Sequence, residues 1–286
     1  MTDPIDAPTV QRLDDRMGLA VQRVVVSSRT VVTYTRDHVI VRTPSHPNDT
    51  LGNTLDLVGI PDVQTLPVWV KRFADTIGMI GAATTRLRFE HPVDVEAPEP
   101  VLAWLRDQHF TLKTSLVHLK EATPPRGRVN GDIRLLADQP VGADQILDRM
   151  WFAADVLDKY RRGSEVSEYV ARDDSEYTET TAVLREHVVA KRARVFVAYR
   201  YGTPVGRIAA THDRQGLVAL HALVVHPAHR RCGIGTALMA AALAGYDTQE
   251  PKVRFGVSVP TGTVARTLLE HEEFTPHALV YTAERT

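Results

Sequence analysis

The sequence predicts an α/β protein with two domains, because strand-like and helix-like patterns follow one another along the chain. The chain has 286 residues, which is more than one average domain. Strand-like and helix-like stretches alternate along both halves. Between the halves, residues 123–127 and 130–131 are rich in Pro and Gly and predict a linker. We therefore expect a smaller α/β domain over residues 1–125 and a second domain over residues 132–286.

The composition limits the class of protein further. Hydrophobic residues make up 43% of the chain and charged residues 24%, so the chain can bury a core. The formal net charge is −1, and we expect neither nucleic acid nor a membrane surface as a partner. Cys232 is the only cysteine, which excludes an intrachain disulfide and a cysteine metal cluster. The acidic start and the lack of a long apolar run favour a cytoplasmic protein.

In the first half, β-rich pieces separated by polar breaks are followed by alternating strand and helix patterns. The β-rich pieces at 24–26, 31–34 and 39–41 predict two or three strands. Further strands are expected at 55–58, 86–89 and 111–119, and helices at 67–77 and 100–108.

In the second half, a first strand precedes two helices, and a hairpin then turns through residues 201–204. Apolar residues at every second position from 253 to 259 predict a half-buried strand. The expected strands are 133–136, 194–199, 205–210, 217–225, 253–259 and 279–281, and the expected helices are 143–160, 179–191, 234–244 and 263–274.

The most informative stretch, residues 217–245, is predicted to form a strand, a tight loop and a helix. The apolar run 217–225 ends at Pro227, which lacks a backbone donor. A helix rich in strong helix formers starts near Ile234 and ends at Gly245. Between them, Gly233 and Gly235 remove Cβ atoms where backbone N–H groups can converge on an anion. The loop is therefore predicted to cradle phosphate.

A short sequence motif resembles the acyl-CoA signature of the GNAT superfamily of N-acetyltransferases. The motif is Arg230-x-x-Gly233-x-Gly235, and it follows Val225-His226-Pro227. The order of elements over residues 132–285 also resembles the GNAT fold, which implies a mixed, splayed sheet flanked by helices. The first half has a similar order but lacks the signature at its first strand-to-helix junction, residues 58–63. It is either a degenerate GNAT-like copy or an unrelated small α/β domain.

The resemblance implies acetyl-CoA as the cofactor. It implies that the backbone of Leu223, Val224 and Val225 pairs with the pantetheine amides, and that the following loop and helix start hold the pyrophosphate. The pyrophosphate residues would be Arg230, Arg231, Cys232, Gly233, Ile234, Gly235 and Thr236. The side chains of Arg231 and Thr236 either contact phosphate or are an ordinary surface arginine and first-turn residue. Cys232 is interpreted as a small loop residue, because no base is fixed beside it.

Acetyl transfer to an amine needs a neutral nucleophile, and an alkyl ammonium has a pKa of about 10.4. His221 is the candidate base, because it places an imidazole with a pKa of about 6.5 in an apolar strand. The stretch resembles the matching strand of the arylalkylamine acetyltransferases, although their second histidine is Ala219 here. The alternative is a core histidine satisfied by a backbone carbonyl.

The acid and the acceptor site are less defined. Many GNAT members carry a tyrosine where this chain has Leu269, and an asparagine where it has Gly262. The possible substitutes for the acid are Ser258, His271 and Tyr281. An acidic, tyrosine-bearing stretch at 168–179 either receives a cationic amine or is a solvated loop.

The resulting hypothesis is an acetyl-CoA-dependent N-acetyltransferase that acts on a primary amine of a small molecule or peptide by direct attack in a ternary complex. No metal is implied, and a homodimer is left open. The competing hypothesis is a non-catalytic acyl-CoA-binding or scaffold protein, because the tyrosine and the asparagine are missing.

Overall fold

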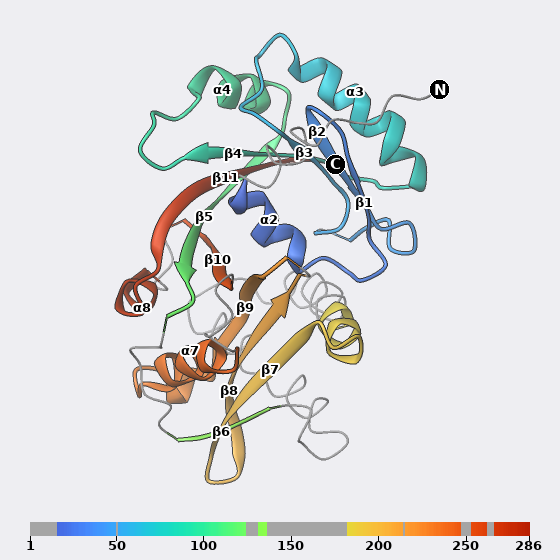
Figure 1. Cartoon of the computed structure of the whole chain (residues 1–286). Coiled ribbons are helices and arrows are strands. Elements are labelled where there is room, and N and C mark those ends of the chain that lie inside the picture. Colours follow the sequence, from blue (N-terminus) through green and yellow to red (C-terminus); the bar gives the residue numbers. More distant parts are fainter. Residues whose placement is uncertain are drawn as a thin grey trace. The chain divides into compact units, whose positions relative to one another are not determined.

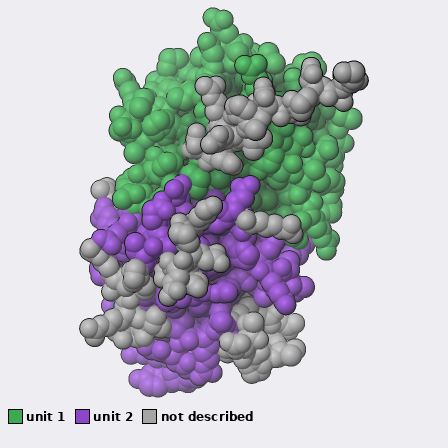
Figure 2. Space-filling view, in the orientation of Figure 1, with its two compact units in different colours: residues 1–119, 256–263, 275–286 green, residues 120–255, 264–274 purple. Residues whose placement is uncertain are grey.

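The computed structural model describes residues 16–49, 51–123, 131–135, 182–213, 215–246, 253–261 and 266–286. By its contacts the chain divides into two compact units (Figure 2). Unit 1 comprises residues 1–119, 256–263 and 275–286, and unit 2 comprises residues 120–255 and 264–274. The domains expected from the sequence, 1–125 and 132–286, are contiguous, whereas these units exchange segments near the C-terminus. The domain ranges themselves stay a prediction.

Unit 1 contains a mixed sheet (Figure 1). Its strands are β1 (Val31–Tyr34), β2 (His38–Arg42), β3 (Thr54–Leu57), β4 (Thr85–Pro92), β5 (Thr111–Glu121) and β11 (Thr275–Arg285), in the order β1-β2-β3-β4-β11-β5. β3 is parallel to β4, and the other pairs are antiparallel. The last strand of the chain thus lies between two strands of the first half.

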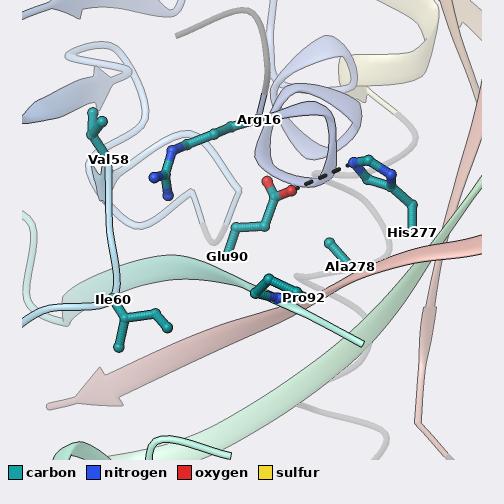
Figure 3. Close-up of a pocket in the computed structure, with 7 residues that line it drawn as sticks. All are labelled: Arg16, Val58, Ile60, Glu90, Pro92, His277 and Ala278. Carbon is teal, nitrogen blue, oxygen red and sulfur yellow. Dashed lines mark ion pairs between the residues drawn. The ribbon is translucent and has the colours of Figure 1, made fainter. Parts of the chain in front are cut away.

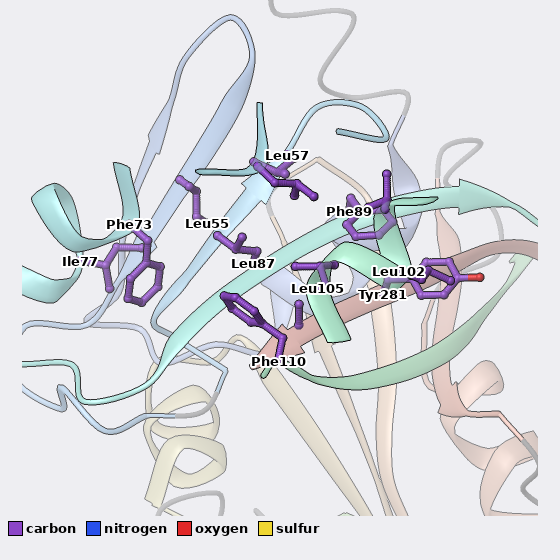
Figure 4. Packing of buried hydrophobic residues seen from close by; sticks show 13 residues of the cluster. Leu55, Leu57, Phe73, Ile77, Leu87, Phe89, Leu102, Leu105, Phe110 and Tyr281 are labelled. Carbon is purple, nitrogen blue, oxygen red and sulfur yellow. The ribbon is translucent and has the colours of Figure 1, made fainter. Parts of the chain in front are cut away.

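The helices of unit 1 are α2 (Met17–Val24), α3 (Leu66–Thr76) and α4 (Glu99–Asp107), with a 3₁₀ turn, η1 (Gly78–Ile80), after α3. Side chains of β3 and β4 pack with those of α3 and α4 in one apolar core (Figure 4). This core includes Leu55, Leu87, Phe73 and Leu105, none of which is more than 1% exposed. The alternation of side chains directs Asp56 and Arg88 to the other face of the sheet, where α2 supplies Arg23.

Most elements expected for the first half are confirmed, but the strand at 24–26 is wrong. Residues 17–24 form α2, and its buried residues Gly18, Leu19, Val21 and Val24 follow helical spacing. Packing of this apolar stripe against β4 and β11 outweighs the β-propensity of the valines.

In unit 2 the sheet order is β10-β9-β8-β7-β6. The strands are β6 (Asp132–Leu135), β7 (Ala193–Arg200), β8 (Thr203–His212), β9 (Leu217–Val225) and β10 (Arg254–Pro260), of which β10 has only its first two residues in this unit. β6 to β9 pair antiparallel in sequence order. The other elements are η3 (Pro227–His229), α7 (Ile234–Ala244) and α8 (Arg266–His271), together with a helical stretch at 182–189.

Two local features explain the geometry of this sheet. Tyr201 and Gly202 both have positive φ, 51° and 77°, as a two-residue type I′ hairpin turn requires. This confirms the expected β7–β8 hairpin. A Cβ atom at Gly206 would lie 2.9 Å from Leu238 Cδ1, so a glycine there allows α7 to approach β8 closely.

The mixed α/β class predicted from the sequence is confirmed. The expected helices 179–191 and 263–274 are helical at 182–189 and 266–271, and the strands expected for the second half are present. The expected helix 143–160 and most of the expected linker lie outside the described residues. Among the helices that the structure describes, none is both long and apolar enough to cross a membrane.

Candidate functional site

The strand β9 contains a bulge just before the residues expected to bind pantetheine. Arg207 lies opposite Val224 and Ala209 lies opposite His221, so the single residue between them on β8 faces both Ala222 and Leu223. Ala222 has a φ of 51°, which is uncommon for a residue with a side chain. A bulge bends a strand and frequently lies beside an active site. The half-buried Leu223, Val224 and Val225 follow this bend directly.

The loop after β9 leads into α7 through a left-handed glycine. The N–H of His226 still donates to the carbonyl of Val205, and η3 follows. Gly233 is the N-cap of α7 with a φ of 76°, and a Cβ atom there would have no heavy atom within 4 Å. The glycine is therefore required by the backbone conformation and leaves open space at the helix start. At Gly235 a Cβ atom would meet its nearest neighbour, Leu268 Cδ2, at 3.8 Å.

The start of α7 is suited to an anion. Within the described part of the chain, no side chain caps this helix. Its first N–H groups and the positive end of its dipole are therefore available to a ligand. Arg231 and Cys232 are exposed, while Ile234 and Thr236 are half-buried. The exposed Arg230 donates from Nε to the carbonyl of Val225 at 2.9 Å, which holds its guanidinium beside the loop. The residues predicted to hold a diphosphate thus lie together and fit one.

His221 lies on the sheet face that the helical stretch 182–189 covers. Its Nε2 lies 2.8 Å from Oγ1 of the buried Thr211, a hydrogen-bond distance. Burial lowers the pKa of His221 to about 3, with further contributions from His187 and Arg207. The ring is therefore neutral at pH 7, but it is a much weaker base than a histidine with an ordinary pKa.

These facts bear on both interpretations of His221. The hydroxyl of Thr211 is the partner of Nε2, and among the described residues no backbone carbonyl is found bonded to the ring. Its role as the base remains a prediction.

Three neighbours of His221 were missed in the sequence. Arg207 and Thr211 could have been found, because period-two alternation along β8 places them on the same face as Ala209, which pairs with His221. His187 is fully buried in the stretch 182–189, and nothing in its sequence context distinguishes it.

The candidates for the acid come from both units. Leu269, which replaces the family tyrosine, is 1% exposed, and His271 is exposed with Nδ1 3.3 Å from Glu272. Ser258 and Tyr281 belong to unit 1. Ser258 accepts a hydrogen bond from Gln22, and Tyr281 stacks on Phe89, where burial raises its pKa. Gly262 and the acidic stretch 168–179 lie outside the described residues.

The loop after β9 and the helix α7 lie in a part of the chain that matches a known family. Residues 156–251 match the model of the acetyltransferase (GNAT) family. The second half of this chain therefore contains a GNAT-family domain, as the signature predicted. No curated protein matches the chain.

Solved structures resemble nearly the whole chain. A functionally unknown conserved protein from Staphylococcus epidermidis has a TM-score of 0.65 at 15% identity, over 92% of this chain and 96% of that chain. A GCN5-related N-acetyltransferase from Kribbella flavida has a TM-score of 0.53 at 14% identity, over 98% and 96%. A tandem GNAT protein from the clavulanic acid biosynthesis pathway has a TM-score of 0.51 at 12% identity, over 98% and 95%. At such identities the similarity establishes the fold alone.

Proposed function

We propose that this chain is an acetyl-CoA-dependent N-acetyltransferase that acts on a primary amine of a small molecule or peptide. The GNAT-family domain supports acyl transfer from acyl-CoA in general. The observation that carries the proposal is the uncapped, glycine-bounded start of α7 directly after the bulged strand β9. A cytoplasmic location is part of the proposal.

The cofactor would be held by backbone groups and one or two cationic side chains. The N–H groups from Gly233 to Thr236 would bind the diphosphate, and Arg230 would add a charge-assisted contact. The backbone of Leu223 to Val225 would pair with the pantetheine amides as an added strand does. When bound, acetyl-CoA supplies the activated acetyl thioester.

The proton that the amine nitrogen releases as its bond to the acetyl carbon forms would pass to His221. Because the pKa of His221 is about 3, it is a poor match for an ammonium with a pKa of about 10.4. The amine should therefore react in its neutral form, with His221 as the proton acceptor during bond formation and solvent as the proton donor to the leaving thiolate.

A second candidate function is acyl-CoA binding without catalysis. It is favoured by two observations, namely the apolar Leu269 in place of a tyrosine and the bond of His221 to Thr211. Under this alternative the loop after β9 would still bind coenzyme A.

Calorimetry with acetyl-CoA, combined with thiol-release assays on a panel of amines, peptides and aminoglycosides, separates the two candidates. We expect saturable binding and amine-dependent thiol release. Binding without release on any acceptor would favour the scaffold, and failure to bind acetyl-CoA would contradict both.

A further inference from the structure

Unit 1 contains a cavity of about 750 Å³ whose described lining residues are not among those of the predicted acyl-CoA loop (Figure 3). Its volume lies within the range of small-molecule sites, about 300–1,000 Å³. The cavity lies where β3 and β4 end beside β11. The lining residues that the structure describes all belong to unit 1, and they are Arg16, Val58, Ile60, Glu90, Pro92, His277 and Ala278.

Glu90 is the acidic group of the cavity. Its side chain is 10% exposed, and its Oε2 accepts the N–H of Leu19 in the first turn of α2 at 3.1 Å. Oε1 lies 3.7 Å from Nε2 of His277, which is an ion-pair distance but too long for a hydrogen bond. Burial raises the pKa of Glu90, against the effect of the Leu19 N–H and the charges of His277 and Arg16. The carboxylate therefore retains acceptor capacity for a ligand donor.

Arg16 is the basic group of the cavity, and Figure 3 shows its guanidinium near Val58, away from His277. Arg16 is half-buried, and burial lowers its pKa while the charge of Glu90 opposes that effect. Among the residues that the structure describes, no hydrogen bond or ion pair to its guanidinium is found. A guanidinium that has lost water without gaining an acceptor binds an anion favourably, and its two-pronged geometry suits a carboxylate.

The remaining walls are apolar. Ile60 is 42% exposed, and Val58, Pro92 and Ala278 complete the apolar lining. A ligand with an apolar body would cover these side chains. The complementary molecule thus has one anionic group, one cationic group and an apolar portion.

We propose that this cavity binds an apolar α-amino acid, with the ligand carboxylate on Arg16, the ligand ammonium on Oε1 of Glu90, and the side chain against Val58, Ile60 and Pro92. Each charged group of the ligand then meets an opposite charge that the fold has partly removed from water. The site is separate in residues from the acyl-CoA loop, so it does not depend on the proposed acetyl transfer.

The experiment uses the full chain and two probes, L-phenylalanine and L-leucine, measured by calorimetry and by the shift of thermal unfolding, without coenzyme A. N-acetyl-L-phenylalanine lacks the ammonium, and L-phenylalaninamide lacks the carboxylate. We expect saturable binding of at least one of the two amino acids. If L-phenylalanine binds, the affinity of each of its two derivatives should be about 10-fold or more weaker than that of L-phenylalanine. If only L-leucine binds, N-acetyl-L-leucine and L-leucinamide replace the two L-phenylalanine derivatives in this comparison.

Arg16→Gln and Glu90→Gln should each weaken binding by about 10-fold or more, because each removes one charge-assisted contact. Arg72→Gln is the matched control, because Arg72 is exposed on α3 and does not line the cavity. Both glutamine variants keep a polar side chain of similar size, and their folding is checked by thermal unfolding. The proposal is overturned if neither amino acid binds up to about 10 mM, or if the N-acetyl or amide derivative binds as well as its parent. Unchanged affinity in folded Arg16→Gln or Glu90→Gln would also overturn it.

Discussion

Two strand-to-helix junctions, one in each unit, follow the same plan with different loops. In unit 1, β3 leads into α3, and in unit 2, β9 leads into α7. Each strand is largely buried or half-buried, and each is followed by a helix and then by a strand of the same sheet. The chemistry differs, because the backbone N–H groups have different partners at the two junctions.

At the junction of unit 1, the protein itself occupies the amides. Asp62 accepts the N–H of Gln64 on Oδ1 at 2.9 Å, and its carbonyl accepts the N–H of Leu66 at 3.2 Å. Pro67, at the start of α3, has no N–H to offer. Neither helix start has a side-chain cap among the described residues, but at the junction of unit 2 Gly233 takes a left-handed φ, and no described backbone partner is found for the N–H groups of residues 234–236. A helix start therefore binds an anion only where its own loop leaves the amides available.

The strands of the two units also differ in how they are held. Asp56 and Arg88 are direct partners in the parallel β3–β4 pair, and two hydrogen bonds of 2.7 and 2.9 Å join them. Arg23 of α2 adds a third bond of 2.8 Å to the same carboxylate. In unit 2, by contrast, β9 is bulged at Ala222. Whether the first half is a degenerate GNAT-like copy or an unrelated α/β domain stays a prediction.

The largest expected effect comes from breaking the ion pair of unit 1. Burial alone would raise the pKa of Asp56, but Arg88 and Arg23 outweigh it and lower that pKa, so the carboxylate is charged. Asp56→Asn leaves two arginines without a counter-charge and should reduce the free energy of unfolding by about 3–5 kcal/mol. Urea unfolding measures this loss. Asp75→Asn, which breaks only the exposed pair with Lys71, should cost less than about 1 kcal/mol. Equal losses in the two variants would mean that the buried pair does not hold these strands.

The next effect concerns the loop of unit 2. Gly233→Asp adds a side chain at a left-handed φ and a negative charge where the diphosphate should bind, and should weaken acetyl-CoA binding by at least about 100-fold. Gly202→Asp is a close control, because Gly202 has a φ of 77° and also has open space around a Cβ atom. Calorimetry should show wild-type affinity for Gly202→Asp. Similar affinities for both variants would contradict the anion site.

His221→Gln tests the catalytic role and should lower the rate by about 10- to 100-fold, the low end for a general base, with little change in cofactor affinity. Since the pKa of His221 is about 3, its neutral form persists at all pH values above that. The rate of the wild-type enzyme should therefore rise with pH as the amine loses its proton, without an inflection near pH 6.5. An inflection there that disappears in His221→Gln would show that the histidine has an ordinary pKa. A variant with the full rate would exclude His221 as the base.

The smallest effect is expected from Arg230→Gln. Loss of one charge-assisted contact at an exposed position should weaken acetyl-CoA binding by about 5- to 10-fold and reduce its salt dependence. Arg200→Gln, at the exposed end of β7, is the control. Affinities measured at low and high salt that do not differ between the two variants would remove Arg230 from the cofactor site.

Features set by local patterns could be predicted from the sequence. The turn at Tyr201-Gly202, the strand β9 and the glycine loop before α7 depend on residues close together in the chain. The helix α2 could not be predicted from the sequence, because valines favour strands. The segment is helical because Val21 and Val24 pack as buried residues of α2.

Contacts between residues far apart in the chain could not be predicted from the sequence either. The position of β11 between β4 and β5 joins the two ends of the chain. The bond of Thr211 to His221 depends on a register that a bulge shifts, and the pKa of His221 depends on burial that its own strand does not reveal. The sequence therefore predicted the glycine loop and the helix after it better than the surroundings of His221.

The proposed cofactor site requires that the backbone N–H groups at the start of α7 bind the diphosphate of coenzyme A. Titration with coenzyme A of protein labelled with ¹⁵N at glycine, followed by amide chemical shifts, tests this contact. Gly233 and Gly235 should move more than the other glycines, and Gly202 should stay in place. If coenzyme A binds while the signals of Gly233 and Gly235 remain unchanged, the cofactor site lies elsewhere and the account is wrong.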